Sequence, residues 1–244
     1  MRIAVFSAFP QELRLIAKNF GATQPSRKCS FTIFSARFAC HEILLVQIGI
    51  GPRNAESAIN YIVKEFSPNY VVSVGFGGAL YEGAVIGELT WAPRVLSLKE
   101  SGMETLEIPD AGTTAGRLTG KISLHEKCVL TLDRWMTKSE IKKILPVGVS
   151  PTVCDMETFP LAKFSIQRGL PFFSIRSITD RAHEEVPQEL LAVCDESGHY
   201  SLLCAFRLIG RKPELIPSII RLGRNSYRAS KNLSLAVRSL IEIL

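Results

Sequence analysis

The stretch PTVCDMETFPLAKFSIQRGLPFFSIRSITD, residues 151–180, contains the pattern that decides the fold. It begins with a short apolar strand, continues into a helical segment and ends in a second apolar run that stops at Asp180. A strand without polar alternation is typical of a parallel sheet that is covered on both faces. The order strand, helix, strand therefore predicts an α/β fold.

The same alternation extends toward the N-terminus. YVVSVGFGG (70–78) is an unbroken apolar run that enters a Gly-rich turn, and CVLTLD (128–133) is a further expected strand. Pro52 is placed to begin a helix, because proline is favoured in the first helical turn. The other expected elements are strands at 1–7, 31–38 and 42–49 and a helix at 11–20. Together they predict three α/β/α layers around a mixed, largely parallel central sheet.

Length and composition indicate one globular domain over residues 1–244, with 46% hydrophobic and 21% charged residues. The apolar runs are too short to span a membrane, and the N-terminus resembles a strand rather than a signal peptide, so we expect a cytoplasmic protein. The six cysteines form no CxxC pair and the four histidines are scattered. We therefore expect no disulfide framework, no metal site and no cofactor.

Two segments are expected to differ from the regular alternation. Residues 100–120 are rich in Gly and Thr, which predicts a long loop. After a polar segment at 183–200, we expect two or three helices that are separated near Pro213 and Pro217, the last running over about 226–243.

The positive charge is concentrated in a helical C-terminal extension, residues 205–244. Eight basic and two acidic residues there differ by +6, which equals the net charge of the whole chain. The simplest interpretation is a solvated basic face. An alternative is peripheral contact with an anionic membrane surface. A nucleic-acid partner is not expected, because this segment contains no motif of nucleic-acid-binding proteins.

Candidate site residues follow from the rule that ligands of open α/β sheets bind at the carboxyl ends of strands. Carboxylates beside a flat aromatic ring suit cleavage of a glycosidic bond to a flat base, which passes through an oxocarbenium-like transition state. Each acidic residue also has a local explanation, such as a favourable position in a first helical turn. The residues at or just after the expected strand ends are Glu12, Phe76, Gly77, Gly78, Trp135, Met136, Met156, Glu157, Arg176 and Asp180.

Four stretches together resemble the nucleoside phosphorylase superfamily, and most closely its 5′-methylthioadenosine/S-adenosylhomocysteine nucleosidase branch. They occur in the same order as in that family, and the last one is the most distinctive. The stretches are MRIAVFSAFPQEL (1–13), YVVSVGFGGAL (70–80), LTLDRWM (130–136) and VCDMETFPLAKFSIQRGLPFFSIRSITDRA (153–182).

The resemblance implies a role for each candidate residue. Asp180 would give a proton to purine N7, Glu12 would position or activate the attacking water, and Arg176 would help to hold that water and the carboxylates. A helix N-terminus at Glu157 would keep that carboxylate ionised. The implied substrate contacts are Glu157 and Met156 with the ribose, Trp135 with the base, the backbone near Met136 with the edge of the base, and the turn of Phe76, Gly77 and Gly78.

Two departures from the family pattern favour hydrolysis over phosphorolysis. Phe76 stands where the phosphorylases carry Ser or Thr for phosphate, and Ser73 stands where they place a phosphate-binding Arg. Phenylalanine cannot form a hydrogen bond with phosphate, and losing the Arg removes its counter-charge. Phe76 also makes the surroundings of the sugar more apolar.

The C-terminal stretch GRKPELIPSIIRLGRNSYRASKNL (210–233) resembles the tail of hopanoid-associated nucleosidases, which release adenine from adenosylhopane. This implies a nucleoside substrate with an apolar, lipid-linked 5′ group. The alternatives are a methylthioadenosine-like substrate, a futalosine-type hydrolase, a phosphate-dependent nucleoside phosphorylase and a binding protein without activity. The family resemblance also implies a homodimer or larger homo-oligomer.

Overall fold

The computed structural model describes residues 1–28, 30–99, 102–187, 189 and 210–244. Within them, twelve strands form one mixed sheet in the order β2-β3-β4-β1-β5-β11-β10-β7-β8, while β12 pairs with β5 and β6, and β9 pairs with β6. The strands are β1 (Arg2–Ser7), β2 (Ser26–Lys28), β3 (Phe31–Phe38), β4 (His41–Gln47), β5 (Tyr70–Ala79), β6 (Leu89–Trp91), β7 (Arg94–Lys99), β8 (Gly102–Glu107), β9 (His125–Glu126), β10 (Val129–Thr131), β11 (Val153–Asp155) and β12 (Phe172–Asp180).

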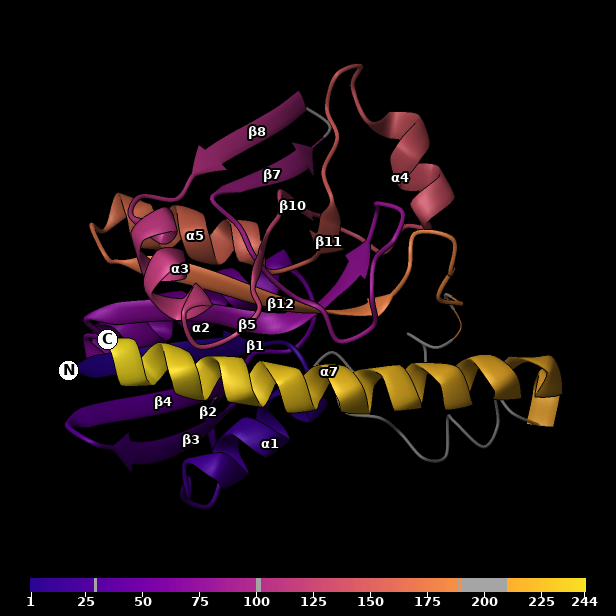
Figure 1. Cartoon of the computed structure of the whole chain (residues 1–244). Coiled ribbons are helices and arrows are strands. Elements are labelled where there is room, and N and C mark those ends of the chain that lie inside the picture. Colours follow the sequence, from indigo (N-terminus) through magenta and orange to yellow (C-terminus); the bar gives the residue numbers. More distant parts are fainter. Residues whose placement is uncertain (29, 100–101, 188, 190–209) are drawn as a thin grey trace.

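Helices cover both faces of this sheet, which confirms the predicted fold class (Figure 1). On one face α7 packs against α1, β5 and β12, and on the other α2 packs against α5. None of the described helices is both long and apolar enough to cross a membrane. The helices are α1 (Pro10–Asn19), α2 (Pro52–Phe66), α3 (Ala111–Thr119), α4 (Lys138–Ile144), α5 (Thr158–Gln167) and α7 (Ile216–Ile243), with a 3-10 turn η2 (Pro213–Leu215) before α7.

The expected long loop at 100–120 is wrong. Residues 102–107 form β8, which pairs with β7 in antiparallel register, and residues 111–119 form α3. Ala111, Ala115 and Leu118 are buried, so a helical repeat of small and apolar residues was present in this Gly- and Thr-rich stretch.

The division of the C-terminus into separate helices at Pro217 is also wrong. Residues 216–243 form the single helix α7, with Pro217 in its first turn, where the missing N–H would have no helical partner. The second half of α7 is buried through residues such as Leu233 and Val237, whereas Ile216 and Ile220 in its first turns are exposed. Most of the polar segment expected at 183–200 and residues 205–209 of the basic extension lie outside the described residues.

Strand β5 positions the candidate site, because it pairs with three other strands. It is parallel to β1 at its start and to β12 over most of its length, and antiparallel to β11 at its end. In the register with β12, Gly75 lies opposite Arg176 and Gly78 opposite Asp180, with a bulge between Ile178 and Asp180. Bulges redirect side chains at sheet edges, and this one occurs where Asp180 leaves the strand.

Candidate active site

One end of the site is formed by Glu12, in the first turn of α1, whose side chain is buried. Its Oε2 accepts hydrogen bonds from Ser7 Oγ at 2.5 Å and from the Phe9 N–H at 2.8 Å, and its Oε1 accepts one from the Phe76 N–H at 2.6 Å. Burial raises the pKa of Glu12 although these donors oppose the shift. A Cβ on Gly75 would lie 2.9 Å from Glu12 Oε1, so glycine allows this approach.

The other end is formed by Asp180, at the end of β12. Its Oδ1 accepts a hydrogen bond from Thr179 Oγ1 at 2.7 Å, and its Oδ2 lies 2.6 Å from the Nζ of Lys138. Burial raises the pKa of Asp180, and the adjacent Lys138 ammonium opposes this shift. A Cβ on Gly78 would lie 2.9 Å from Asp180 Oδ2, which again makes glycine necessary for the close packing.

The two ends lie next to different glycines of β5. Gly75 faces Glu12 and Gly78 faces Asp180, three residues apart on β5. At about 3.3 Å per strand residue, these positions are roughly 10 Å apart. Between them, Gly77 is buried against Val153 and the Phe76 side chain is partly exposed.

Arg176 connects the middle of the site to a carboxylate that the sequence analysis missed. Its Nε donates to Asp155 Oδ2 at 2.8 Å, and its Nη2 donates to Ser73 Oγ at 2.7 Å and to Thr158 Oγ1 at 2.6 Å. Asp155 also accepts a hydrogen bond from Thr131 Oγ1 at 2.6 Å. Arg176 therefore forms its ion pair with Asp155 rather than with Glu12 or Glu157. It acts on those two carboxylates only through its charge, which opposes the rise in their pKa values.

Glu157 lies at the start of α5, as predicted, but its surroundings raise its pKa and so favour the protonated form. Its Oε1 accepts a hydrogen bond from the N–H of Gly51, which caps α2, at 2.7 Å. Burial, followed by repulsion from Asp155, raises the pKa of Glu157, while the Gly51 N–H and Arg176 oppose the shift. The effect of desolvation on the pKa of Glu157 is thus larger than the opposite effect expected from the helix N-terminus.

The aromatic and thioether candidates follow the ends of β10 and β11. Trp135 is partly exposed in the loop between β10 and α4, and its indole Nε1 is buried without a hydrogen-bond partner among the described residues. A buried indole N–H is normally paired, so this unpaired atom is an exception to the usual pattern. Met136 and Met156 both pack against one small apolar cluster, which consists of Leu96, Leu130, Leu132 and Ile141.

Comparison with known proteins places this site in a family. Residues 2–201 match the model of the phosphorylase superfamily. The chain belongs to the phosphorylase superfamily. Within the superfamily it is similar to a 5′-methylthioadenosine/S-adenosylhomocysteine nucleosidase of Shewanella loihica, with 23% identity over 86% of this chain and 99% of the relative. A nucleosidase of the same name from Maridesulfovibrio salexigens is 26% identical over 76% of this chain and 88% of the relative.

Solved structures of the superfamily share the fold. The Campylobacter jejuni 5′-methylthioadenosine/S-adenosyl homocysteine nucleosidase matches with a TM-score of 0.76 and 16% identity, covering 100% of both chains. The futalosine hydrolase of Helicobacter pylori matches with a TM-score of 0.77 and 16% identity, covering 100% of this chain and 98% of that one. The resemblance predicted from the four sequence stretches is thereby confirmed at the level of the superfamily and its nucleosidase branch.

Proposed function

We propose that this protein is an N-ribosyl hydrolase that releases adenine from an adenosine-type nucleoside with an apolar 5′ substituent. The observation that carries this proposal is a pair of carboxylates at opposite ends of the Gly75–Gly78 segment, Glu12, which is buried, and Asp180, whose side chain is only 13% exposed. Both have raised pKa values because they are buried, which suits groups that exchange protons with a substrate near neutral pH.

In this proposal each end of the site performs one part of the hydrolysis. Asp180 protonates N7 of the purine as the bond between C1′ and N9 breaks, and Glu12 positions the water that attacks C1′. Glu157 accepts hydrogen bonds from the ribose hydroxyls, and Met156 packs against the ribose. Trp135 stacks on the base, which is supported by the partial exposure of this residue in the loop between β10 and α4.

Water rather than phosphate is the proposed nucleophile. The Arg176 guanidinium is already paired with Asp155, and Ser73 Oγ is used by Arg176. The Phe76 N–H, a backbone donor in the Gly-rich turn, is used by Glu12. The donors nearest to Glu12 are thus occupied by protein groups, and the side chain of Phe76 adds none for phosphate.

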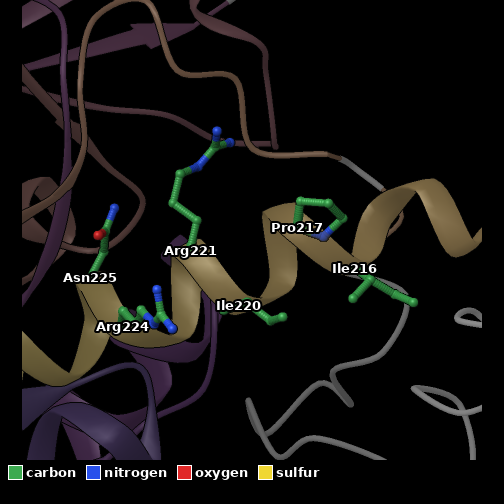
Figure 2. A pocket seen from close by; sticks show the side chains of 6 residues that line it. All are labelled: Ile216, Pro217, Ile220, Arg221, Arg224 and Asn225. Atoms are coloured by element: carbon green, nitrogen blue, oxygen red, sulfur yellow. The ribbon is translucent and has the colours of Figure 1, made fainter.

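An open hollow of about 530 Å³, with described lining residues from α7, lies along the first turns of this helix. Figure 2 shows its lining of Ile216, Pro217, Ile220, Arg221, Arg224 and Asn225. Arg221 and Asn225 also line a smaller hollow that contains Asp180, so the two spaces adjoin. Asn225 Nδ2 donates to the Thr179 carbonyl at 2.8 Å, which ties this part of α7 to the end of β12.

The nature of the 5′ group remains a proposal with three candidates. A lipid such as the hopane of adenosylhopane is supported by the resemblance of the C-terminal stretch 210–233, and exposed Arg221 and Arg224 favour contact with an anionic membrane surface. A methylthio group is supported by the nucleosidase relatives, and an aromatic extension by the futalosine hydrolase neighbour.

We also propose that the enzyme works as a homodimer or larger homo-oligomer, which light scattering after size exclusion would test.

The deciding experiment measures adenine release in phosphate-free buffer from methylthioadenosine, from futalosine and from adenosines with long apolar 5′ groups. Preference for the long apolar groups would support the lipid proposal, and release only after phosphate is added would establish a phosphorylase instead. Tight nucleoside binding without turnover would indicate a binding protein.

Flotation with anionic liposomes tests the membrane contact. The wild-type protein is compared with an Arg221→Glu, Arg224→Glu double variant, and equal flotation of the two proteins would contradict the contact.

A further inference from the structure

Lys138, the first residue of α4, places a buried ammonium group on the side chain of Asp180. Only 6% of the Lys138 side chain and 13% of the Asp180 side chain are exposed, and their Nζ and Oδ2 atoms lie 2.6 Å apart. The same ammonium group also donates a hydrogen bond to the carbonyl of Arg181. With Thr179 Oγ1 on Oδ1, both oxygens of Asp180 accept hydrogen bonds from the protein.

This arrangement is more than an anchor for α4. Glu185 already ties the first turn of α4 to the segment after β12, because it accepts from the N–H groups of Lys138 and Ser139 and from Ser139 Oγ. Burying an ammonium group and a carboxylate costs several kcal/mol for each ion, which a second anchor would not require. The pair also bears on the acid role, because a cation at 2.6 Å opposes the rise in the pKa of Asp180 that burial causes and so disfavours the protonated form that a general acid needs.

We propose that Lys138 is a positioning residue that holds the proton Asp180 delivers to the leaving base. This inference rests on the proposed hydrolysis. Before the reaction the pair is an ammonium group and a carboxylate. Lys138 passes one of its protons to the carboxylate, and N7 takes this proton from Asp180 as the C1′–N9 bond breaks and its electron pair stays on the base. The water oxygen bonds to C1′, and the water proton goes to Glu12.

The other charged or titratable groups around this pair cannot replace Lys138. Burial raises the pKa of Cys154 on β11 to about 12, so this thiol, which is next to Asp180, stays neutral and is a poor acid. Glu184 adds negative charge that raises the pKa of Asp180, and Glu185 is used by the start of α4. Arg221 lines the hollow beside Asp180, but a guanidinium group does not release a proton in proteins.

Two variants distinguish proton transfer from simple charge. Lys138→Arg keeps the positive charge but cannot give up a proton, so we expect kcat to fall roughly 10²-fold or more at every pH, with KM nearly unchanged. Lys138→Met removes the charge, so Asp180 must keep its own proton in its buried position. The kcat of that variant should fall at alkaline pH and recover toward pH 5, whereas wild-type kcat persists to higher pH.

The outcomes separate this inference from the proposed function. Absence of adenine release by the wild-type enzyme overturns the proposed hydrolysis, whereas a wild-type pH profile of kcat in both variants overturns the role of Lys138. If Lys138→Arg keeps full kcat, the residue supplies charge alone. NMR titration of ¹³C-labelled aspartate tests the pairing without turnover. The pKa of Asp180 should be higher in Lys138→Met than in wild type, and an equal pKa would contradict the pairing.

Discussion

Glu12 and Asp180 are both buried carboxylates at the edge of strand β5, yet their surroundings differ in charge. Glu12 accepts hydrogen bonds from three neutral donors, Ser7 Oγ and the N–H groups of Phe9 and Phe76. Asp180 accepts from one neutral hydroxyl and from the Lys138 ammonium. Two carboxylates in different environments take opposite roles in acid–base catalysis, one giving and one receiving a proton.

The difference indicates how one fold can separate these two roles. In the proposed reaction, neutral donors orient Glu12 to accept a proton from water. The ammonium group at Asp180 would supply a proton as well as an opposite charge, which suits delivery to the base.

Replacing Asp180 with Asn should abolish turnover, because an amide cannot deliver a proton to N7. We expect kcat to fall roughly 10²–10⁴-fold while nucleoside binding, measured by isothermal titration calorimetry, survives. Asp133→Asn is the matched control, since Asp133 follows β10 but is exposed. Near wild-type kcat for Asp180→Asn would remove Asp180 from the chemistry.

Replacing Glu12 with Gln tests the other end of the comparison. Because glutamine cannot accept a proton from water, we expect kcat to fall by roughly 10²-fold or more, with little change in the affinity for the base. Ser7→Ala is the control, since it removes one donor but leaves the carboxylate and two N–H groups. A larger loss from Ser7→Ala than from Glu12→Gln would mean that Glu12 serves the structure rather than the reaction.

Replacing Glu157 with Gln should change the dependence of stability on pH. Because the pKa of Glu157 is raised on folding, its contribution to stability is fully present below the unfolded value and is lost as pH rises through the folded value. The neutral variant avoids that loss and can still accept from Gly51. Its Tm, measured by calorimetry, should match wild type near pH 4 and exceed it by roughly 2–4 °C at alkaline pH for each 1 kcal/mol gained. An equal Tm over this range would contradict the raised pKa.

The sequence predicted that both carboxylates belong to the site, but it did not predict the charged partner of Asp180. Four residues were predicted to share one site: Glu12, Glu157, Arg176 and Asp180. This was possible because they belong to regular elements, whose strand ends can be located from the sequence. Lys138 lies on a short helix and meets Asp180 only through tertiary packing. A lysine after a loop is usually solvated, so nothing local distinguished this one.

Asp155 and α3 were missed for reasons that also concern packing. Asp155 precedes the Met156–Glu157 pair, and its importance follows from a bond to Arg176 on β12 that has no local sequence signal. Residues 111–119 are helical because Ala111, Ala115 and Leu118 are buried, which overrides the low helix propensity of their Gly and Thr neighbours. The missed features therefore depend on contacts between distant segments.

Replacing Trp135 with Ala should give the smallest change, a weaker affinity for the base. Loss of stacking weakens binding of the base by roughly 1–3 kcal/mol, to judge from stacking on aromatic residues in other proteins. Trp135→Phe keeps a flat ring and should restore most of this affinity, while losing the indole N–H, which has no partner among the described residues. Calorimetric titration with adenine separates the two contributions. Equal affinity in both variants and wild type would place the base elsewhere, and the Lys138–Asp180 pair would then lie at the wrong end of the substrate to protonate it.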